Sequence, residues 1–127
     1  MKVNIVLIIF ALLFAISPAK AALPADSIWQ LDAQITDQNG KTIALKELAG
    51  KPRLLSMFYS SCPYMCPLII DTGLAVQHNL SVAERAKLGV LMISIDPKKD
   101  TPKVLQALMT KRKLNPNERT LARADEK

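Results

Sequence analysis

The sequence predicts one α/β domain in which buried strands alternate with helices. Two apolar runs, residues 53–59 and 90–95, have the composition of strands that are covered on both faces. Each run is followed by a segment in which apolar residues recur every three or four positions, which indicates an amphipathic helix. A strand–helix–strand–helix order implies parallel strands joined by a right-handed crossover.

The first 21 residues are typical of a targeting segment. One lysine precedes an uninterrupted apolar run of twelve residues, 5–16, and Ala19-Lys20-Ala21 has the small-x-small form of a signal-peptidase site. Twelve residues are fewer than the roughly 20 that span a bilayer. We therefore expect a signal peptide at residues 1–21, with an uncleaved membrane anchor as the alternative. Residues 22–127 would then be exported to the periplasm or to the periplasmic face of the cytoplasmic membrane.

The remaining residues are enough for one small domain and too few for two. They carry fifteen basic and eleven acidic residues once Lys2 and Lys20 are set aside. The basic residues are scattered apart from Lys98-Lys99 and Lys111-Arg112-Lys113, and no aromatic residue is interleaved with them. We therefore expect no nucleic-acid binding. A solvated face that favours anionic lipid or an acidic partner is the better interpretation.

The N-terminal part of the domain predicts a β-hairpin. Residues 28–35 alternate imperfectly between apolar and polar and predict a strand. Gln38-Asn39-Gly40-Lys41 predicts the turn, since Asn-Gly readily takes the positive φ angles of a two-residue loop. Residues 42–44 predict the returning strand, and residues 45–49 a turn of helix that stops at Gly50.

Three helices are expected after the hairpin. Residues 67–79 predict the first, with a buried stripe formed by Leu68, Ile69, Thr72, Val76 and Leu80. Residues 81–87 predict the second, with Ser81 as N-cap and Glu84 at the capping-box spacing.

The third helix follows the polar loop at residues 96–100. Thr101 is its expected N-cap and Pro102 its first residue. Its core face would consist of Val104, Leu105, Leu108 and Met109. Residues 120–122 predict a short strand near the end of the chain.

Both cysteines of the chain, Cys62 and Cys66, lie in the turn between the first buried strand and the first helix. Residues four apart in near-helical backbone share a face, so their sulfur atoms can meet. Pro67 predicts a helix start directly after Cys66, where the helix dipole would lower the pKa of that thiol. A disulfide closing so short a loop stabilises a fold by only about 2 kcal/mol. We therefore favour a functional dithiol over a structural disulfide.

Residues 57–67, which contain Cys62-Pro63-Tyr64-Met65-Cys66-Pro67, and residues 93–102 together resemble the Sco (SenC) family. Its members are thioredoxin-like copper chaperones that help to assemble the binuclear copper centre of cytochrome c oxidase. The resemblance implies a thioredoxin-like fold with an N-terminal hairpin. It also implies that copper, as Cu(I) or Cu(II), is bound by Cys62, Cys66 and one histidine. The implied partner is the copper-bearing subunit of cytochrome c oxidase or another copper chaperone, with membrane association through the N-terminus as an alternative.

The histidine is where this chain departs from the family pattern. In the family it lies on a later hairpin, whereas the one histidine here, His78, follows Cys66 by twelve residues on the same predicted helix. At 1.5 Å per residue that is about 18 Å, against about 2 Å for a metal–imidazole bond. We therefore expect that His78 is not a ligand. We also expect a C-terminally truncated homologue that lacks the last strands and the closing helix.

Three functions remain open from the sequence. Cys62 and Cys66 would bind Cu(I) in a copper carrier, because soft thiolates select soft metal ions. They would exchange electrons with partner cysteines in a thiol-disulfide oxidoreductase, which is the one enzymatic activity expected. A remnant with neither activity is the third hypothesis.

Other candidate residues have a structural interpretation that we favour. Met57 and Met65 are candidate thioether ligands, but methionines beside a core strand usually pack. Asp96 and Asp100 resemble paired carboxylates, but the turn at Pro97 and the helix start at Thr101 explain them. Trp29 is expected to pack.

Overall fold

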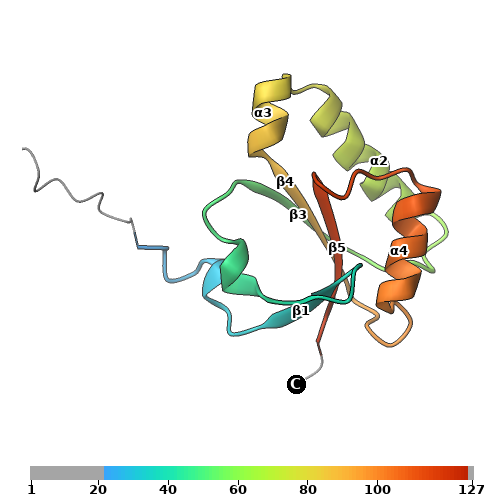
Figure 1. Cartoon of the computed structure of the whole chain (residues 1–127), viewed down its shortest axis with the longest axis horizontal. Coiled ribbons are helices and arrows are strands. Elements are labelled where there is room, and N and C mark those ends of the chain that lie inside the picture. Colours follow the sequence, from blue (N-terminus) through green and yellow to red (C-terminus); the bar gives the residue numbers. More distant parts are fainter. Residues whose placement is uncertain (1–21, 126–127) are drawn as a thin grey trace, which may run out of the picture.

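The computed structural model describes residues 22–125, so the targeting segment expected at residues 1–21 lies outside the described residues. Five strands form one mixed sheet in the order β2-β1-β5-β4-β3. Helices α2 and α4 cover one face of this sheet, and two short 3-10 helices lie on the other (Figure 1). The α/β class predicted from the sequence is confirmed. Among the described residues, no helix is long and apolar enough to cross a membrane.

The N-terminal hairpin forms with its turn at the predicted residues 38–41, but the connection has four residues, and Gly40 has positive φ whereas Asn39 does not. Strands β1 (Gln34–Asp37) and β2 (Thr42–Ala44) are antiparallel, and Gly40 between them has a φ of +79°. The following 3-10 helix is η2 (Leu45–Leu48).

The strand expected at residues 28–35 is wrong in its first half. Ile28–Gln30 form a 3-10 helix, η1, whose start is capped by the Ser27 hydroxyl, which accepts a hydrogen bond from the Trp29 N–H. This turn packs Ile28 and Trp29 against the core cluster beneath the hairpin, so the packing role expected of Trp29 is confirmed.

The core unit runs from β3 (Arg53–Phe58) through α2 (Met65–His78), α3 (Val82–Lys87) and β4 (Gly89–Ser94) to α4 (Pro102–Lys111). Strands β3 and β4 are parallel, as the strand–helix–strand pattern requires. Ser81 and Glu84 form the expected capping box of α3. The last strand is longer than the predicted residues 120–122.

That last strand, β5 (Arg119–Ala124), lies at the centre of the sheet. It is parallel to β4 and antiparallel to β1, so it joins the hairpin to the core. Its Leu121 and Ala122 are completely buried, one on each face.

Only one of the two strands that were expected to be covered on both faces is covered in that way. All six residues of β4 are buried. Strand β3 is the edge of the sheet, most of its residues are half-buried, and Met57 is 55% exposed. The expectation failed for β3 because, at the edge of the sheet, the layers on the two faces cover it less completely than they cover β4.

Helix α2 buries a different stripe from the one expected. Its buried residues are Cys66, Ile70, Gly73 and Gln77, whereas Leu68 is 57% and Val76 40% exposed. Both faces of the helix are apolar, so periodicity did not distinguish them. The sheet selects the face with Gly73, where an added Cβ would lie 3.4 Å from the Arg119 side chain.

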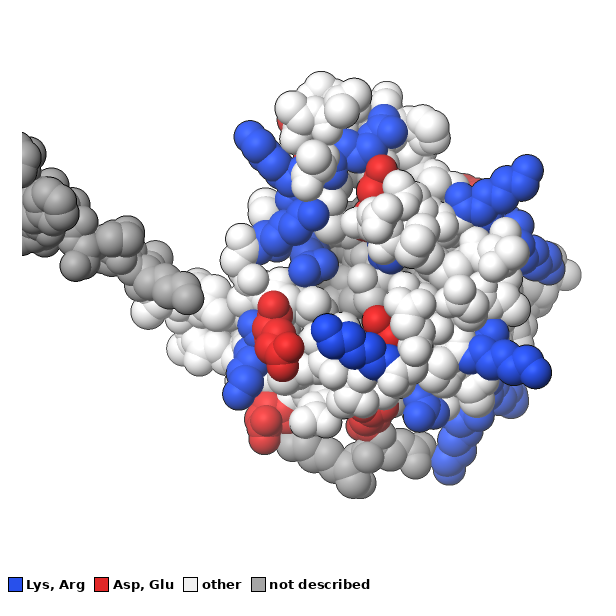
Figure 2. Space-filling view, in the orientation of Figure 1, with Lys and Arg blue, Asp and Glu red and all other residues white. Residues whose placement is uncertain are grey.

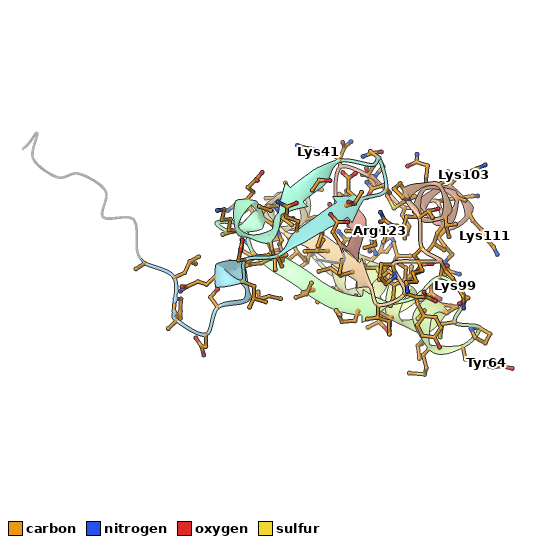
Figure 3. All side chains as sticks on the ribbon, turned by 90° about the horizontal axis from the view of Figure 1, so that it is seen from below. Lys41, Tyr64, Lys99, Lys103, Lys111 and Arg123 are labelled. Atoms are coloured by element: carbon orange, nitrogen blue, oxygen red, sulfur yellow. The ribbon has the colours of Figure 1, made fainter. Side chains whose placement is uncertain are left out.

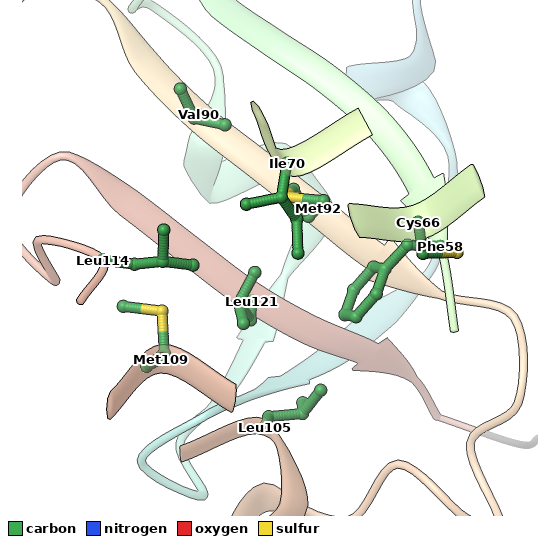
Figure 4. Close-up of a cluster of buried hydrophobic side chains, with 9 residues drawn as sticks. All are labelled: Phe58, Cys66, Ile70, Val90, Met92, Leu105, Met109, Leu114 and Leu121. Atoms are coloured by element: carbon green, nitrogen blue, oxygen red, sulfur yellow. The ribbon is translucent and has the colours of Figure 1, made fainter. Parts of the chain in front are cut away.

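The main core fills the space between the sheet and its two long helices (Figure 4). Helix α4 contributes Leu105 and Met109 to it, as expected, while Val104 is 36% exposed. The cluster consists of Phe58, Cys66, Ile70, Val90, Met92, Leu105, Met109, Leu114 and Leu121. One of the two cysteines is therefore part of the hydrophobic core.

Two alanine variants distinguish the observed face of α2 from the predicted one. Because Ile70 is 3% exposed, Ile70→Ala should lower the free energy of unfolding by about 2–5 kcal/mol. Leu68→Ala should lower it by less than about 1 kcal/mol, since most of that side chain is in solvent. Urea denaturation of the reduced protein measures both. An equal loss for the two variants would mean that the face containing Leu68 is buried.

Candidate dithiol site

The site is the loop between β3 and α2, together with the first turn of α2. Cys62 and Cys66 are both free thiols, and the backbone N–H of Cys66 donates to Cys62 Sγ at 3.4 Å. The N–H of Tyr59, just after β3, donates to Cys66 Sγ at 3.4 Å. The structure thus brings the two cysteines together at the start of the helix.

Helix α2 begins two residues earlier than expected. Tyr64 is the N-cap, so Cys66 is the second helical residue and Pro67 the third. A proline is tolerated there because the N–H groups of the first helical turn have no partner within the helix. As a result the sulfur of Cys62, which precedes the helix, accepts a hydrogen bond from the backbone N–H of Cys66 in the first turn.

The two thiols have opposite pKa shifts. The N–H of Cys66 is the main cause that lowers the pKa of Cys62 to about 6, and the Cys66 thiol, the N–H of Tyr64 and the Tyr59 hydroxyl also lower it. Burial is the main cause that raises the pKa of Cys66, and the charges of Cys62 and Asp100 add to it. The expectation that the helix start would lower the pKa of Cys66 is therefore wrong. Its side chain turns into the core beside Phe58 (Figure 4).

The buried carboxylate of Asp100 is hydrogen-bonded to the start of the cysteine loop. Asp100 is 1% exposed and accepts hydrogen bonds from the N–H of Ser60, at 2.9 Å, and from the hydroxyls of Ser60 and Ser94. Asp96, by contrast, is half-buried and paired with Lys99 at 3.5 Å. The structural role favoured for Asp100 is thus present, but its connection to the cysteine loop was missed. The available signal was that Ser60 and Ser94 follow or end neighbouring parallel strands, whose carboxyl ends share one edge of a sheet.

Two of the remaining candidate donors, Met57 and His78, lie away from the sulfur atoms, and the third, Met65, is exposed. Met57 lines a hollow with Ile93 on the hairpin side of the sheet, opposite the core that contains Cys66. Met65 is beside Cys66 in sequence but is 60% exposed, so the packing expected of both methionines is wrong. His78 is the exposed last residue of α2, at the opposite end of the helix from the cysteines.

A cavity of about 290 Å³ opens beside the two cysteines. Phe58, Ile70 and Leu108 contribute apolar surface to it, and Lys111 and Arg112 from the end of α4 contribute positive charge. In residues 22–125, no group of three or more histidine, cysteine or acidic residues could hold a metal ion. The site therefore offers two sulfur donors next to an open, positively charged cavity.

The opposite pKa shifts predict stepwise titration of the reduced protein. Thiolate absorbance near 240 nm should rise first around pH 6, from Cys62, and again at a pH above the ordinary range of a thiol, from Cys66. Cys62→Ser should remove the first step, because the remaining thiol is the buried one. If the low step persists in Cys62→Ser and disappears in Cys66→Ser, the assignment of the two thiols is reversed.

Comparison with known proteins places these features in a family. A sequence model described as SCO1/SenC matches residues 25–117. The chain is 36% identical over 76 residues to the mitochondrial protein SCO2 of Saccharomyces cerevisiae, covering 60% of this chain and 25% of that protein. The chain spans between about a quarter and two fifths of the length of the first curated relatives that it matches.

Solved structures agree with the sequence comparison. A putative electron transfer protein from Aquifex aeolicus superposes with a TM-score of 0.65 at 29% identity, covering 74% of this chain and 54% of that one. ScoI of Bradyrhizobium japonicum, solved with copper bound, superposes with a TM-score of 0.59 at 31% identity, covering 73% and 57%. The expected thioredoxin-like fold of Sco proteins is thus confirmed, and since the family model matches well over half of the sequence, the chain belongs to the SCO1/SenC family.

Proposed function

We propose that this protein binds Cu(I) through Cys62 and Cys66 and passes it to a partner. The observation that carries the proposal is the convergence of two sulfur atoms at the start of α2, where the N–H of Cys66 lowers the pKa of Cys62 to about 6. Soft thiolates select Cu(I) over hard cations. The copper bound to ScoI of Bradyrhizobium japonicum, a solved relative, supports the assignment.

The two sulfur atoms would have different parts in binding. Cys62 is half-buried and already ionised at neutral pH, so it would be the first ligand. Cys66 is buried with a raised pKa, so it would release a proton to solvent as it binds the metal. Binding of Cu(I) should therefore tighten as the pH rises.

The partner we propose is the copper-bearing subunit of cytochrome c oxidase or another copper chaperone. Family membership supports this choice, and the targeting segment expected from the sequence at residues 1–21 supports an exported protein at or near the periplasmic face of the membrane. Copper delivery of this kind needs a donor site that is open to a second protein. The half-buried Cys62, beside the exposed Tyr64, meets that need.

Anaerobic competition with a Cu(I) chelator tests the copper proposal. One Cu(I) should bind per reduced chain, more tightly at pH 8 than at pH 5. Cys62→Ser and Cys66→Ser should each weaken binding beyond the roughly 10–100-fold that changes outside the ligand set cost. His78→Ala is the matched control and should bind as the unaltered protein does. Unchanged binding in either serine variant would reject the dithiol as the copper site.

The asymmetry of the two thiols also supports a second function, thiol-disulfide exchange. The Cys62 thiolate would attack a disulfide of a partner, forming a mixed disulfide and releasing one partner thiol. Cys66 would then lose its proton and attack Cys62 Sγ, releasing the second partner thiol. The partner disulfide gains two electrons and two protons, and this protein is left with a Cys62–Cys66 disulfide. An accessible low-pKa thiol next to a buried high-pKa thiol suits this order of events.

Trapping of the mixed disulfide tests this second function. With a model peptide disulfide, Cys66→Ser should accumulate a covalent adduct through Cys62, since no second thiol is left to release it. Cys62→Ser should accumulate none at neutral pH. Mass spectrometry under non-reducing conditions distinguishes the two variants, and equal adduct formation by both would refute the proposed order of attack.

A further inference from the structure

We propose that the surface around Cys62 is a docking site for an acidic, cysteine-bearing segment of a partner protein. On one side of the dithiol lies a basic stripe on α4, formed by Lys103 and Lys111. On the other lies an exposed apolar lip at the start of α2, formed by Tyr64 and Met65. This inference rests on the proposed function, because it describes the partner that would exchange copper or thiols with this site.

The basic stripe carries charge that is not neutralised locally. Lys103 and Lys111 are separated by two steps of four residues, so they lie on one face of α4, and both are exposed. The sequence has neither aspartate nor glutamate between residues 101 and 117. Neither lysine forms an ion pair with any residue that the structure describes. Both charges are therefore available to a partner.

Three acidic side chains near α4 in sequence or in space are already occupied. Asp71 pairs with Arg112, and Asp96 pairs with Lys99 at 3.5 Å. Asp100 is 1% exposed and accepts hydrogen bonds from serine side chains. Basic side chains accordingly lie along the edge of the molecule formed by α4 (Figure 2). Such a surface attracts an acidic partner and raises its rate of association.

The basic stripe leads to the dithiol. Lys111 lines the cavity of about 290 Å³ that both cysteines border. Lys103 and Lys111 extend from the same end of the molecule as Tyr64 (Figure 3). A partner segment held by the two lysines would thus have its own cysteines close to Cys62.

The apolar lip has the composition of an interface. Tyr64 is 83% and Met65 60% exposed, although both side chains are large. Tyrosine and methionine are enriched in the cores of protein–protein interfaces. Both residues lie between Cys62 and Cys66 in the chain, so a partner that covers them is necessarily beside the dithiol. The apolar lip would supply buried contact area, and the basic stripe would orient the partner.

The structure favours a protein partner over anionic lipid. Helices that lie on a membrane bind through their apolar face. The apolar face of α4 is used in the core, where Leu105 and Met109 are buried. A bilayer that lay on the basic stripe would also cover the cavity beside Cys62 and exclude partner cysteines.

A peptide titration tests the docking surface directly. The probe is a short peptide rich in glutamate, and its neutral control has glutamine in the same places. Both carry serine where the disulfide-forming version has cysteine. Added to the full reduced chain with isotope-labelled amides, the acidic peptide should shift the NMR signals of Tyr64, Lys103 and Lys111. The neutral peptide should not, and 1 M salt should abolish the shifts, because it shortens the screening length to about 3 Å.

Charge-reversal variants test the basic stripe. Lys103→Glu combined with Lys111→Glu should weaken binding of the acidic peptide about tenfold, since two exposed attractive contacts become repulsive. Lys41→Glu combined with Lys46→Glu is the matched control. It changes the net charge equally at exposed lysines of the hairpin turn and η2, so binding should be unchanged. Tyr64→Ala should weaken binding about fivefold, whereas Tyr64→Phe should retain it.

Reaction kinetics test whether docking serves the dithiol. In the Cys66→Ser chain, Cys62 Sγ would form the new S–S bond with the cysteine-containing peptide disulfide, and one peptide thiol would leave. The glutamate peptide should react faster than the glutamine peptide, and reversing both lysines of the basic stripe should remove this preference. Hydroxyethyl disulfide is uncharged, so its rate corrects for any change in the reactivity of Cys62.

The outcomes separate this inference from the function on which it rests. If both peptides shift the same amides equally, or the two double variants weaken binding equally, the docking surface is overturned while copper binding and thiol exchange stand. Binding of phosphatidylglycerol vesicles through the basic stripe, without binding of the acidic peptide, would also overturn it. If the acidic peptide docks but the reduced chain neither binds Cu(I) nor exchanges thiols, the proposed function fails and the docking surface stands.

Discussion

The buried carboxylate of Asp100 is the constraint on which the arrangement of the dithiol depends. It accepts hydrogen bonds from the N–H and the hydroxyl of Ser60 and from the hydroxyl of Ser94. These bonds connect the start of the cysteine loop to the end of β4. A buried charge is tolerated only when hydrogen bonds replace its lost water. Breaking these hydrogen bonds would cost free energy, so Ser60 and the loop that follows it stay in one position. Cys62 can then reach the amide of Cys66.

This placement makes two chemically identical residues different. Cys62 lies outside the helix, where an amide of the first turn stabilises its thiolate, while Cys66 lies inside the helix and turns toward Phe58 in the core. The asymmetry suits the proposed copper binding and the proposed thiol exchange alike. In both proposed reactions one sulfur would act first, and the second would follow once its proton can leave.

One side of the domain has the character of an interface. Strand β3 is the sheet edge, and the uncovered face of α2 borders an apolar hollow of about 260 Å³ lined by Leu54, Leu68 and Val76. Unpaired strand edges next to exposed apolar surface are typically covered in folded proteins. Among the described residues, this side of the domain therefore leaves a strand edge and apolar side chains of α2 exposed to solvent.

The sequence by itself determined the local elements with strong chemical signals: the Asn-Gly turn, the capping box of α3, the buried strand β4 and the family motifs around the cysteines. Each depends on residues close together in the chain. Only the tertiary structure decided which apolar face of α2 is buried, since the sheet selects the face with Ile70 and Gly73. It likewise decided which thiol has the lower pKa, because that depends on where α2 begins and on the burial of Cys66 in the core. Packing between residues far apart in the sequence determines these features, and the spacing of apolar residues along the chain does not specify that packing.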